Sequence, residues 1–185
     1  VRTDLFGNPK YPLEKRRSVA EKFRKSGCLN LGFSLESANE KILEMMEKRV
    51  RREYFHEQVK ILKEAGITSS VSVVFGYPIE TKDTIQETFN MCLENRIYPS
   101  IGYLLPLPST KMYDYALNNG FISDEDQYLE LITERQDLCI NMTGLESEEI
   151  LDAIKEGATE LNNQLQLGLE EGSLIRTGSY RNHTD

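Results

Sequence analysis

The sequence predicts an α/β fold in which parallel strands form part of a (β/α) barrel and helices follow at the C-terminal end. Runs with the two-residue period of a strand alternate with runs of helical period up to about residue 121. The strand runs lie about thirty to forty residues apart, as βα units require. After Gly120 only helical runs follow. Three clear strands are too few for a closed eight-stranded barrel, so we expect an arc of one or a small open sheet.

Four elements are expected in the first 36 residues of the chain. Val1–Leu5 could be the end of a further strand, and Gly7, Pro9 and Pro12 mark a loop. A helix over Leu13–Lys25 buries Val19, Ala20 and Phe23. The strand Leu29–Glu36 alternates apolar and small polar residues and ends on a carboxylate.

A helix follows that strand almost at once. Ile42, Met45, Met46 and Arg49 fall at helical spacing from Ala38, and Ser37 with Glu40 fits a capping box. Glu36 therefore stands at the carboxyl end of a parallel strand, which is where such folds bind ligands.

The remaining elements follow the same rules of periodicity, capping and termination. The central part of the chain is expected to contain a helix Glu53–Ala65, a strand Ile67–Phe75, a helix capped by Thr81, a strand Ser100–Leu105 and a short helix capped by Ser109 or Thr110 that ends near Asn119. The last part is expected to contain a helix from Glu125 to about Leu138 with a capping box of Ser123 and Asp126, and a long helix from Ser147 to Leu169. We expect residues 1–121 to form the barrel part, 122–172 a helical extension and 173–185 a polar, disordered tail.

The two faces of the predicted sheet differ. Leu31, Phe33, Val71 and Val73 share the face that must meet helices, and the opposite face carries Ser34, Glu36, Ser70, Ser72 and Gly102. For Ser34 and Ser70 we favour small residues that let layers pack closely. For Glu36 and Ser72 we favour a lined cavity, because a carboxylate that faces a barrel interior needs a partner.

Composition excludes several classes of function. The net charge of −8 argues against a nucleic-acid surface. No apolar run approaches a membrane span, and no signal peptide is evident. Because the first residue is Val, we expect a part of a longer protein. We interpret Cys28, Cys92 and Cys139 as small buried residues of a reduced cytoplasmic protein and His56 and His183 as surface residues.

Three segments in the order and spacing found here resemble the radical S-adenosylmethionine (radical SAM) enzymes. They are Gly32–Ser37 with Ile42-Leu43 and Met46–Lys48, then Leu62–Ile67 with Phe75–Thr81, and finally Leu105–Tyr113. The sequence is most similar to members with a cobalamin-binding domain and to the methylthiotransferase and coproporphyrinogen-oxidase type. The resemblance covers Val1 to about Phe121.

Two departures from that family matter. Ile79 and Ser109 stand where the family has glycine, so those turns form without positive φ or at a cost. The Cys-x-x-x-Cys-x-x-Cys loop that holds the family's 4Fe–4S cluster is absent. The resemblance implies that this loop precedes Val1, so that residues 1–121 are the C-terminal half of a barrel, inert alone and joined to an upstream domain.

The resemblance also implies cofactor contacts at the strand ends. Glu36 is similar to the residue that bonds S-adenosylmethionine near its ribose or amino group, Lys48 to a partner of its carboxylate, and Ser72 to a contact of the ribose hydroxyls. Lys48 is equally explained as a solvated charge at a helix end. The further candidates are Gly76 and Tyr77 beside the adenine, Leu104 or Leu105 on its face, and Arg2 and Ser34 toward the cavity.

The function implied is that of a radical SAM enzyme that generates a 5′-deoxyadenosyl radical, with cobalamin-dependent methyl transfer as in some relatives. Its partners would be S-adenosylmethionine, a substrate and the upstream domain. Two alternatives stay open: an ordinary α/β ligand-binding domain, and an interaction module whose helices between Ser123 and Leu169 dock a partner.

Overall fold

The protein contains a parallel three-stranded sheet, which confirms the predicted fold class. A computed structural model describes residues 2, 4–48, 50–132 and 137–175. The strands are β1 (Asn30–Glu36), β2 (Thr68–Phe75) and β3 (Ser100–Tyr103), and they lie in the order β1-β2-β3. Val1 and Thr3, in the predicted N-terminal strand, lie outside the described residues, and Asp4–Gly7 form a turn.

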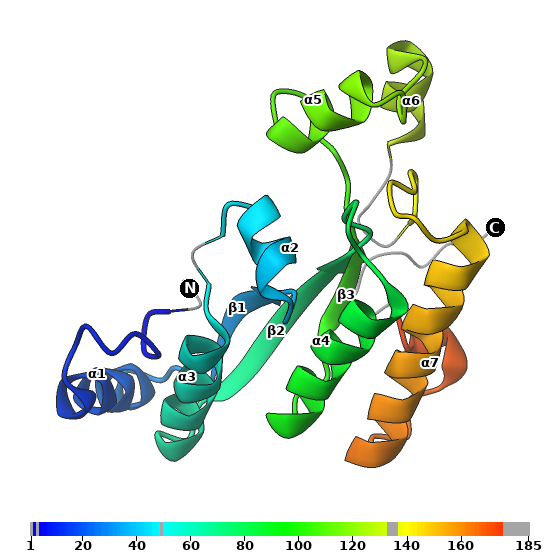
Figure 1. Ribbon diagram of the computed structural model, residues 1–185. Coiled ribbons are helices and arrows are strands. Elements are labelled where there is room, and N and C mark those ends of the chain that lie inside the picture. Colours follow the sequence, from blue (N-terminus) through cyan, green and yellow to red (C-terminus); the bar gives the residue numbers. More distant parts are fainter. Residues whose placement is uncertain (1, 3, 49, 133–136, 176–185) are drawn as a thin grey trace.

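The helices are divided between one face of the sheet and its upper edge. Figure 1 shows α3 (Arg52–Glu64), α4 (Lys82–Glu94) and α7 (Ser147–Leu165) along one face, with α1 (Leu13–Lys25) beside α3. Toward the carboxyl ends of the strands lie α2 (Glu40–Met45), α5 (Lys111–Asn118) and α6 (Glu125–Leu131). A short 3₁₀ helix, Glu171–Ser173, follows α7. Within the described ranges, no helix is long and apolar enough to cross a bilayer.

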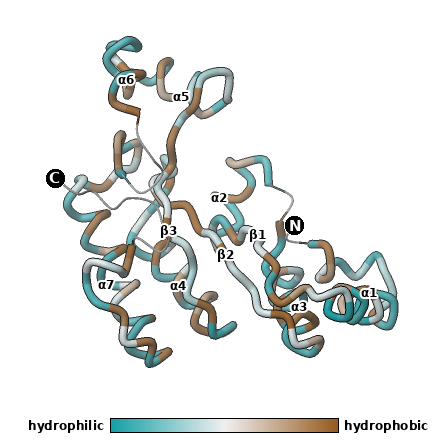
Figure 2. Tube along the Cα trace, turned by 180° about the vertical axis from the view of Figure 1, so that it is seen from behind, coloured by the Kyte–Doolittle hydropathy of each residue, from teal (hydrophilic) through white to brown (hydrophobic). Residues whose placement is uncertain are grey.

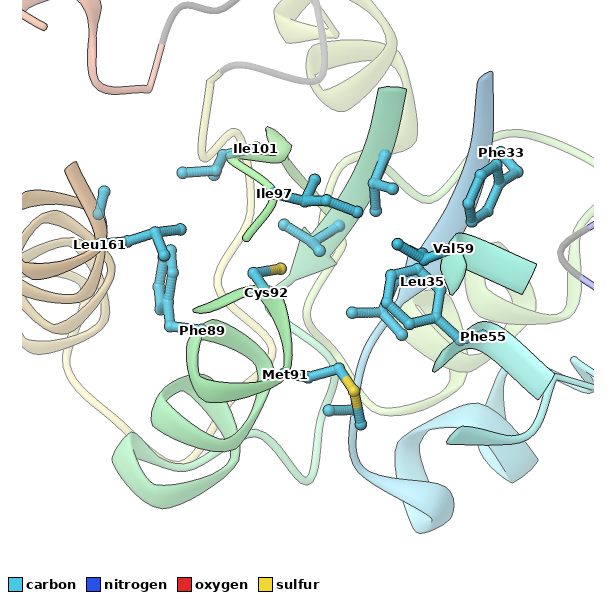
Figure 3. Close-up of a cluster of buried hydrophobic side chains, with 14 of the residues drawn as sticks. Phe33, Leu35, Phe55, Val59, Phe89, Met91, Cys92, Ile97, Ile101 and Leu161 are labelled. Carbon is cyan, nitrogen blue, oxygen red and sulfur yellow. The ribbon is translucent and has the colours of Figure 1, made fainter. Parts of the chain in front are cut away.

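The helix-covered face of the sheet forms the main core, as its apolar residues predicted. In Figure 3 the side chains of Phe33 and Leu35 lie near those of Phe55 and Val59 from α3. The ring centroids of Phe33 and Phe55 are 5.7 Å apart. Cys92 of α4 is buried in the same core, and burial raises the pKa of its thiol to about 12, so it acts as a small apolar residue.

The opposite face of the sheet carries hydrogen bonds between side chains of neighbouring strands. Asn30 Nδ2 donates to Thr68 Oγ1 at 2.9 Å, and Ser70 Oγ donates to Asn30 Oδ1 at 2.9 Å. The hydroxyls of Ser34 and Ser72 are 2.8 Å apart. Seen from behind in Figure 2, no helix of the described part of the chain covers these strands. The close-packing interpretation of Ser34 and Ser70 was therefore wrong, because both residues form polar links between strands.

Helix α7 packs against α4, so the helices beyond residue 121 are not separate from the sheet. Ile150, Ile154 and Leu161 of α7 are buried in the main core. Leu174, in the predicted tail, is also buried, and its carbonyl accepts a 2.5 Å hydrogen bond from Tyr98 Oη. Residues 176–185 lie outside the described part.

Two predicted helix starts were wrong by one or two residues. The N-cap of α2 is Asn39, whose Oδ1 accepts from the amides of Lys41 and Ile42, because the strand ends in a tight turn that occupies Ser37. The N-cap of α6 is Asp124. The predicted caps Thr81 and Thr110 are confirmed.

The two positions that lack the family's glycine differ in backbone conformation. Ser109 has φ +67°, the left-handed region that costs a residue with a Cβ about 1–2 kcal/mol. Ile79 is not among the residues with positive φ, so its turn forms without that cost.

We predict that Ser109→Gly raises the free energy of unfolding by about 1 kcal/mol, because the strain removed exceeds the extra freedom given to the unfolded chain. Chemical denaturation measures this change. Ser109→Ala is the control, since it keeps the Cβ and should gain nothing. A destabilised glycine variant would contradict the prediction.

We predict that Gly157→Ala destabilises the contact of α7 with α4. A Cβ there would lie 2.3 Å from Cδ2 of Phe89, so the ring must shift, at a cost of about 1–3 kcal/mol that exceeds alanine's better helix propensity. Denaturation should show lower stability than in Gly144→Ala, where nothing lies within 4 Å of the added atom. Equal stability of the two variants would be the contrary result.

Candidate functional site

An ion pair at the carboxyl end of β1 joins the first two predicted site residues. Glu36 Oε1 lies 2.8 Å from Lys48 Nζ, across 12 positions of sequence. The Glu36 side chain is 9% exposed and that of Lys48 is 47% exposed. Lys48 is thus the partner of a buried carboxylate and not only a solvated charge at a helix end.

Left-handed backbone occurs at Glu36 itself and at Glu47, directly before Lys48. Glu36 has φ +64° at the centre of a three-residue turn in which the Ser37 amide donates to the Leu35 carbonyl at 2.9 Å. Such γ-turns are rare and strained. Glu47 has φ +54°, and the Lys48 amide closes the end of α2 on the Leu43 carbonyl at 2.9 Å. Strained residues of this kind are concentrated at ligand sites.

The loop after β2 contains a buried carboxyl group that the sequence analysis did not select. Glu80 is 2% exposed, and Gly76, with φ +101°, donates its amide to Glu80 Oε2 at 3.3 Å. Thr84 Oγ1 donates to Oε1 at 2.5 Å. Burial raises the pKa of Glu80 to about 7, and hydrogen bonds from Thr84, Gly76 and Tyr77 offset only part of that rise. In the sequence, the only sign of this site was the position of Glu80, a single carboxylate between the end of a strand and the helix cap Thr81.

Tyr77 and Leu104 belong to a second core above the sheet. Both are buried with Val74, Tyr113 and Tyr128 from β2, α5 and α6. Leu104 donates its amide to the carbonyl at the end of β2 at 2.7 Å, and its Cβ would lie 3.8 Å from a Cβ at Gly76. The structure therefore brings Gly76, Tyr77 and Leu104 together, and Leu105 is half-buried beside them.

Ser72 and Arg2, two further predicted site residues, lie in different parts of the structure. Ser72 is on the polar face of β2, paired in register with Ser34 of β1. Arg2 precedes a turn, its side chain is 77% exposed, and its guanidinium lies 3.0 Å from Asp4. Arg2 and Lys48 also line a single cavity of about 670 Å³ between the N-terminal segment, α2 and α3.

The chain can be tested against the cofactors that the resemblance implies. Among the described residues, no three His, Cys, Asp or Glu side chains gather where they could hold a metal ion, so this part of the chain does not fit an iron–sulfur cluster. The charges of Glu36 and Lys48 do fit the ammonium and carboxylate of an amino-acid group such as that of S-adenosylmethionine.

We predict that Glu80→Gln alters how stability depends on pH. Because the folded protein binds this proton more tightly than the unfolded chain, the group favours folding at low pH, and its contribution falls by about 3 kcal/mol as pH rises from 4.5 to about 7. Denaturation of wild type and variant at several pH values should show a difference that declines over that window. Glu156→Gln, an exposed position on α7, should show no such decline. A difference that is constant with pH would refute this assignment.

Part of the chain matches a known protein family. Residues 8–92 match the model of the Radical SAM superfamily. An uncharacterized methyltransferase of Pyrococcus horikoshii is 29% identical over 105 residues, which are 56% of this chain and 23% of that protein. A threonylcarbamoyladenosine tRNA methylthiotransferase of Drosophila melanogaster is 31% identical over 108 residues, covering 56% and 19% of the two chains.

A solved structure agrees with this comparison at the level of the fold. Coproporphyrinogen III oxidase from Escherichia coli, described as a radical SAM enzyme, superimposes with a TM-score of 0.57 at 15% identity, over 80% of this chain and 30% of that chain. The chain thus spans about a quarter or less of the two curated relatives. Over residues 8–92 the chain is thus similar in sequence to the radical SAM superfamily, and its fold resembles that of a solved enzyme described as a radical SAM enzyme.

Proposed function

We propose that this chain supplies part of the S-adenosylmethionine site of a radical SAM enzyme. The observation that carries the proposal is the Glu36–Lys48 ion pair at the carboxyl end of β1. The methionyl group of S-adenosylmethionine carries an ammonium and a carboxylate. Glu36 can accept hydrogen bonds from that ammonium and Lys48 can donate to that carboxylate, so the ligand replaces each residue's present partner with one of equal charge.

Other residues at the same edge suit the rest of the ligand. The hydroxyls of Ser72 and Ser34 can exchange their mutual 2.8 Å hydrogen bond for bonds to ribose hydroxyls. Gly76 has no side chain to block a purine ring, and the half-buried Leu105 offers apolar surface nearby, whereas Tyr77 and Leu104 are buried in the second core. Arg2 lines the same cavity as Lys48 and gives a second cation near the ligand carboxylate.

S-adenosylmethionine, bound beside a reduced 4Fe–4S cluster that other residues would hold, would supply the radical chemistry for hydrogen abstraction from substrate. The residues described here bind and orient the sulfonium ligand and exclude water from it. In this proposal the cluster ligands and an upstream domain lie elsewhere in a longer cytoplasmic protein. Cobalamin-dependent methyl transfer is the finer form of the proposal, supported by a relative that is named as a methyltransferase.

We predict that Glu36→Gln and Lys48→Met each weaken S-adenosylmethionine binding about ten- to a hundredfold, since each leaves one charge of the ligand unpaired. Calorimetric titration of the full-length protein, purified and reconstituted without oxygen, measures the affinity. Formation of 5′-deoxyadenosine is the second readout.

Lys82→Met is the matched control, because Lys82 forms an exposed ion pair with Glu149 at 3.0 Å on α7. It should bind S-adenosylmethionine as wild type does. Unchanged affinity in both Glu36→Gln and Lys48→Met would favour an ordinary α/β ligand-binding domain instead.

A further inference from the structure

We propose that Thr88 of α4 is a positioning residue for the Glu36–Lys48 pair, and that the adjacent Glu87 fixes α2, the helix that precedes Lys48. This inference rests on the proposed function, and it adds residues of α4 that touch neither charge of the pair. Their contacts connect the carboxyl end of β1 to a helix that is distant in sequence.

The side chain of Thr88 is buried and uses both of its hydrogen-bonding capacities. Its Oγ1 accepts from the Ala38 amide at 3.0 Å, across 50 positions of sequence. The same hydroxyl donates to the Thr84 carbonyl at 3.1 Å, one turn back in α4. It also lies 3.5 Å from Ser37 Oγ. The hydroxyl is thus oriented by its own helix and fixes the amide two residues after Glu36.

That amide directly follows the turn that sets the direction of the Glu36 side chain. Glu36 has φ +64°, which costs free energy unless neighbouring contacts hold it. The described contacts are the Ser37 amide to the Leu35 carbonyl, the Asn39 amide to Ser37 Oγ at 3.1 Å, and the bond to Thr88. Among these, the bond to Thr88 joins the turn to another element of the fold. Without it, a buried amide loses its partner and the turn can relax toward an extended backbone.

Glu87 acts on the other partner of the pair through α2. Its carboxylate accepts from Asn39 Nδ2 at 3.0 Å and from Arg52 Nη1 at 2.6 Å. Asn39 is the N-cap of α2, and Lys48 closes the opposite end of that helix. Two adjacent residues of α4 therefore fix the turn that contains Glu36 and the start of the helix that precedes Lys48.

Two comparisons isolate the hydroxyl of Thr88. The first sets wild type against Thr88→Val, and the second sets Thr88→Ser against Thr88→Ala. Thr88→Val keeps the shape of threonine without the hydroxyl, and Thr88→Ser with Thr88→Ala differ from each other in the hydroxyl alone. Thr159→Val is the control, because the Thr159 hydroxyl bonds the Lys155 carbonyl of its own helix at 2.7 Å. Calorimetry of the full-length, oxygen-free protein gives the affinity for S-adenosylmethionine. Hydrogen-exchange mass spectrometry of the peptide over residues 36–40 reports the turn without ligand.

We expect Thr88→Val and Thr88→Ala to bind S-adenosylmethionine about tenfold more weakly and to exchange faster over residues 36–40, whereas Thr88→Ser and Thr159→Val stay near wild type. If Thr88→Val does not fold, the serine and alanine variants decide. Glu36→Gln, measured in parallel, separates the two proposals.

Equal affinities for Thr88→Ser and Thr88→Ala, in a protein that Glu36→Gln weakens, would overturn the positioning role and leave the proposed function standing. Wild-type affinity in Glu36→Gln would overturn both. Lower melting temperature with unchanged affinity and exchange would reduce Thr88 to a packing residue and also overturn the inference.

Discussion

The structure depends on the one-sided burial of a parallel sheet. β2 pairs with both other strands, and its Val71, Val73 and Phe75 are buried against helices on one face. Burial of that face supplies the hydrophobic stabilisation, and it requires α3, α4 and α7 to lie side by side. The other face is therefore free to carry serine, threonine and asparagine. The candidate site lies where the two faces end, at the carboxyl termini of β1 and β2.

Helix α4 connects this packing to the site. Its inner side places Phe89 and Cys92 in the main core, and its first turns contact both loops that carry candidate ligand contacts. Thr84 holds Glu80 after β2, and Thr88 holds the turn after β1. A single helix, fixed by apolar burial, thus sets the relative position of the loops after β1 and β2. These two loops are far apart in sequence: Ser34 and Ser72, on the strands that lead into them, are separated by 38 positions.

Much of the fold could be predicted because hydrophobic period and turn residues are local signals. The strands, most helices and the caps Thr81 and Thr110 followed from them. The cap of α2 was misplaced by two residues because Ser37 is part of the turn at Glu36, so the helix is capped by Asn39 instead. The hydrogen bonds of Ser34 and Ser70 were missed because each partner lies on another strand, and sequence spacing does not show which hydroxyls meet.

For the site, sequence selected Glu36 and Lys48, which the structure joins, but it assigned no role to Glu80 or Thr88. Their importance arises from burial and from partners distant in sequence, and neither residue type is unusual in a helix or its first turn. The strain at Glu36 was equally hidden, since glutamate gives no local signal for a left-handed backbone.

The left-handed residues at Glu36 and Glu47 have a consequence for binding. Folding, and not the ligand, supplies the free energy that holds both charged side chains in place. A ligand that enters between them does not have to order the backbone of either partner, so the entropic cost of association is lower. For the binding proposed above, the edge of β1 is in this sense preorganised, so mutations that loosen the fold would weaken that binding even where they leave every ligand contact intact.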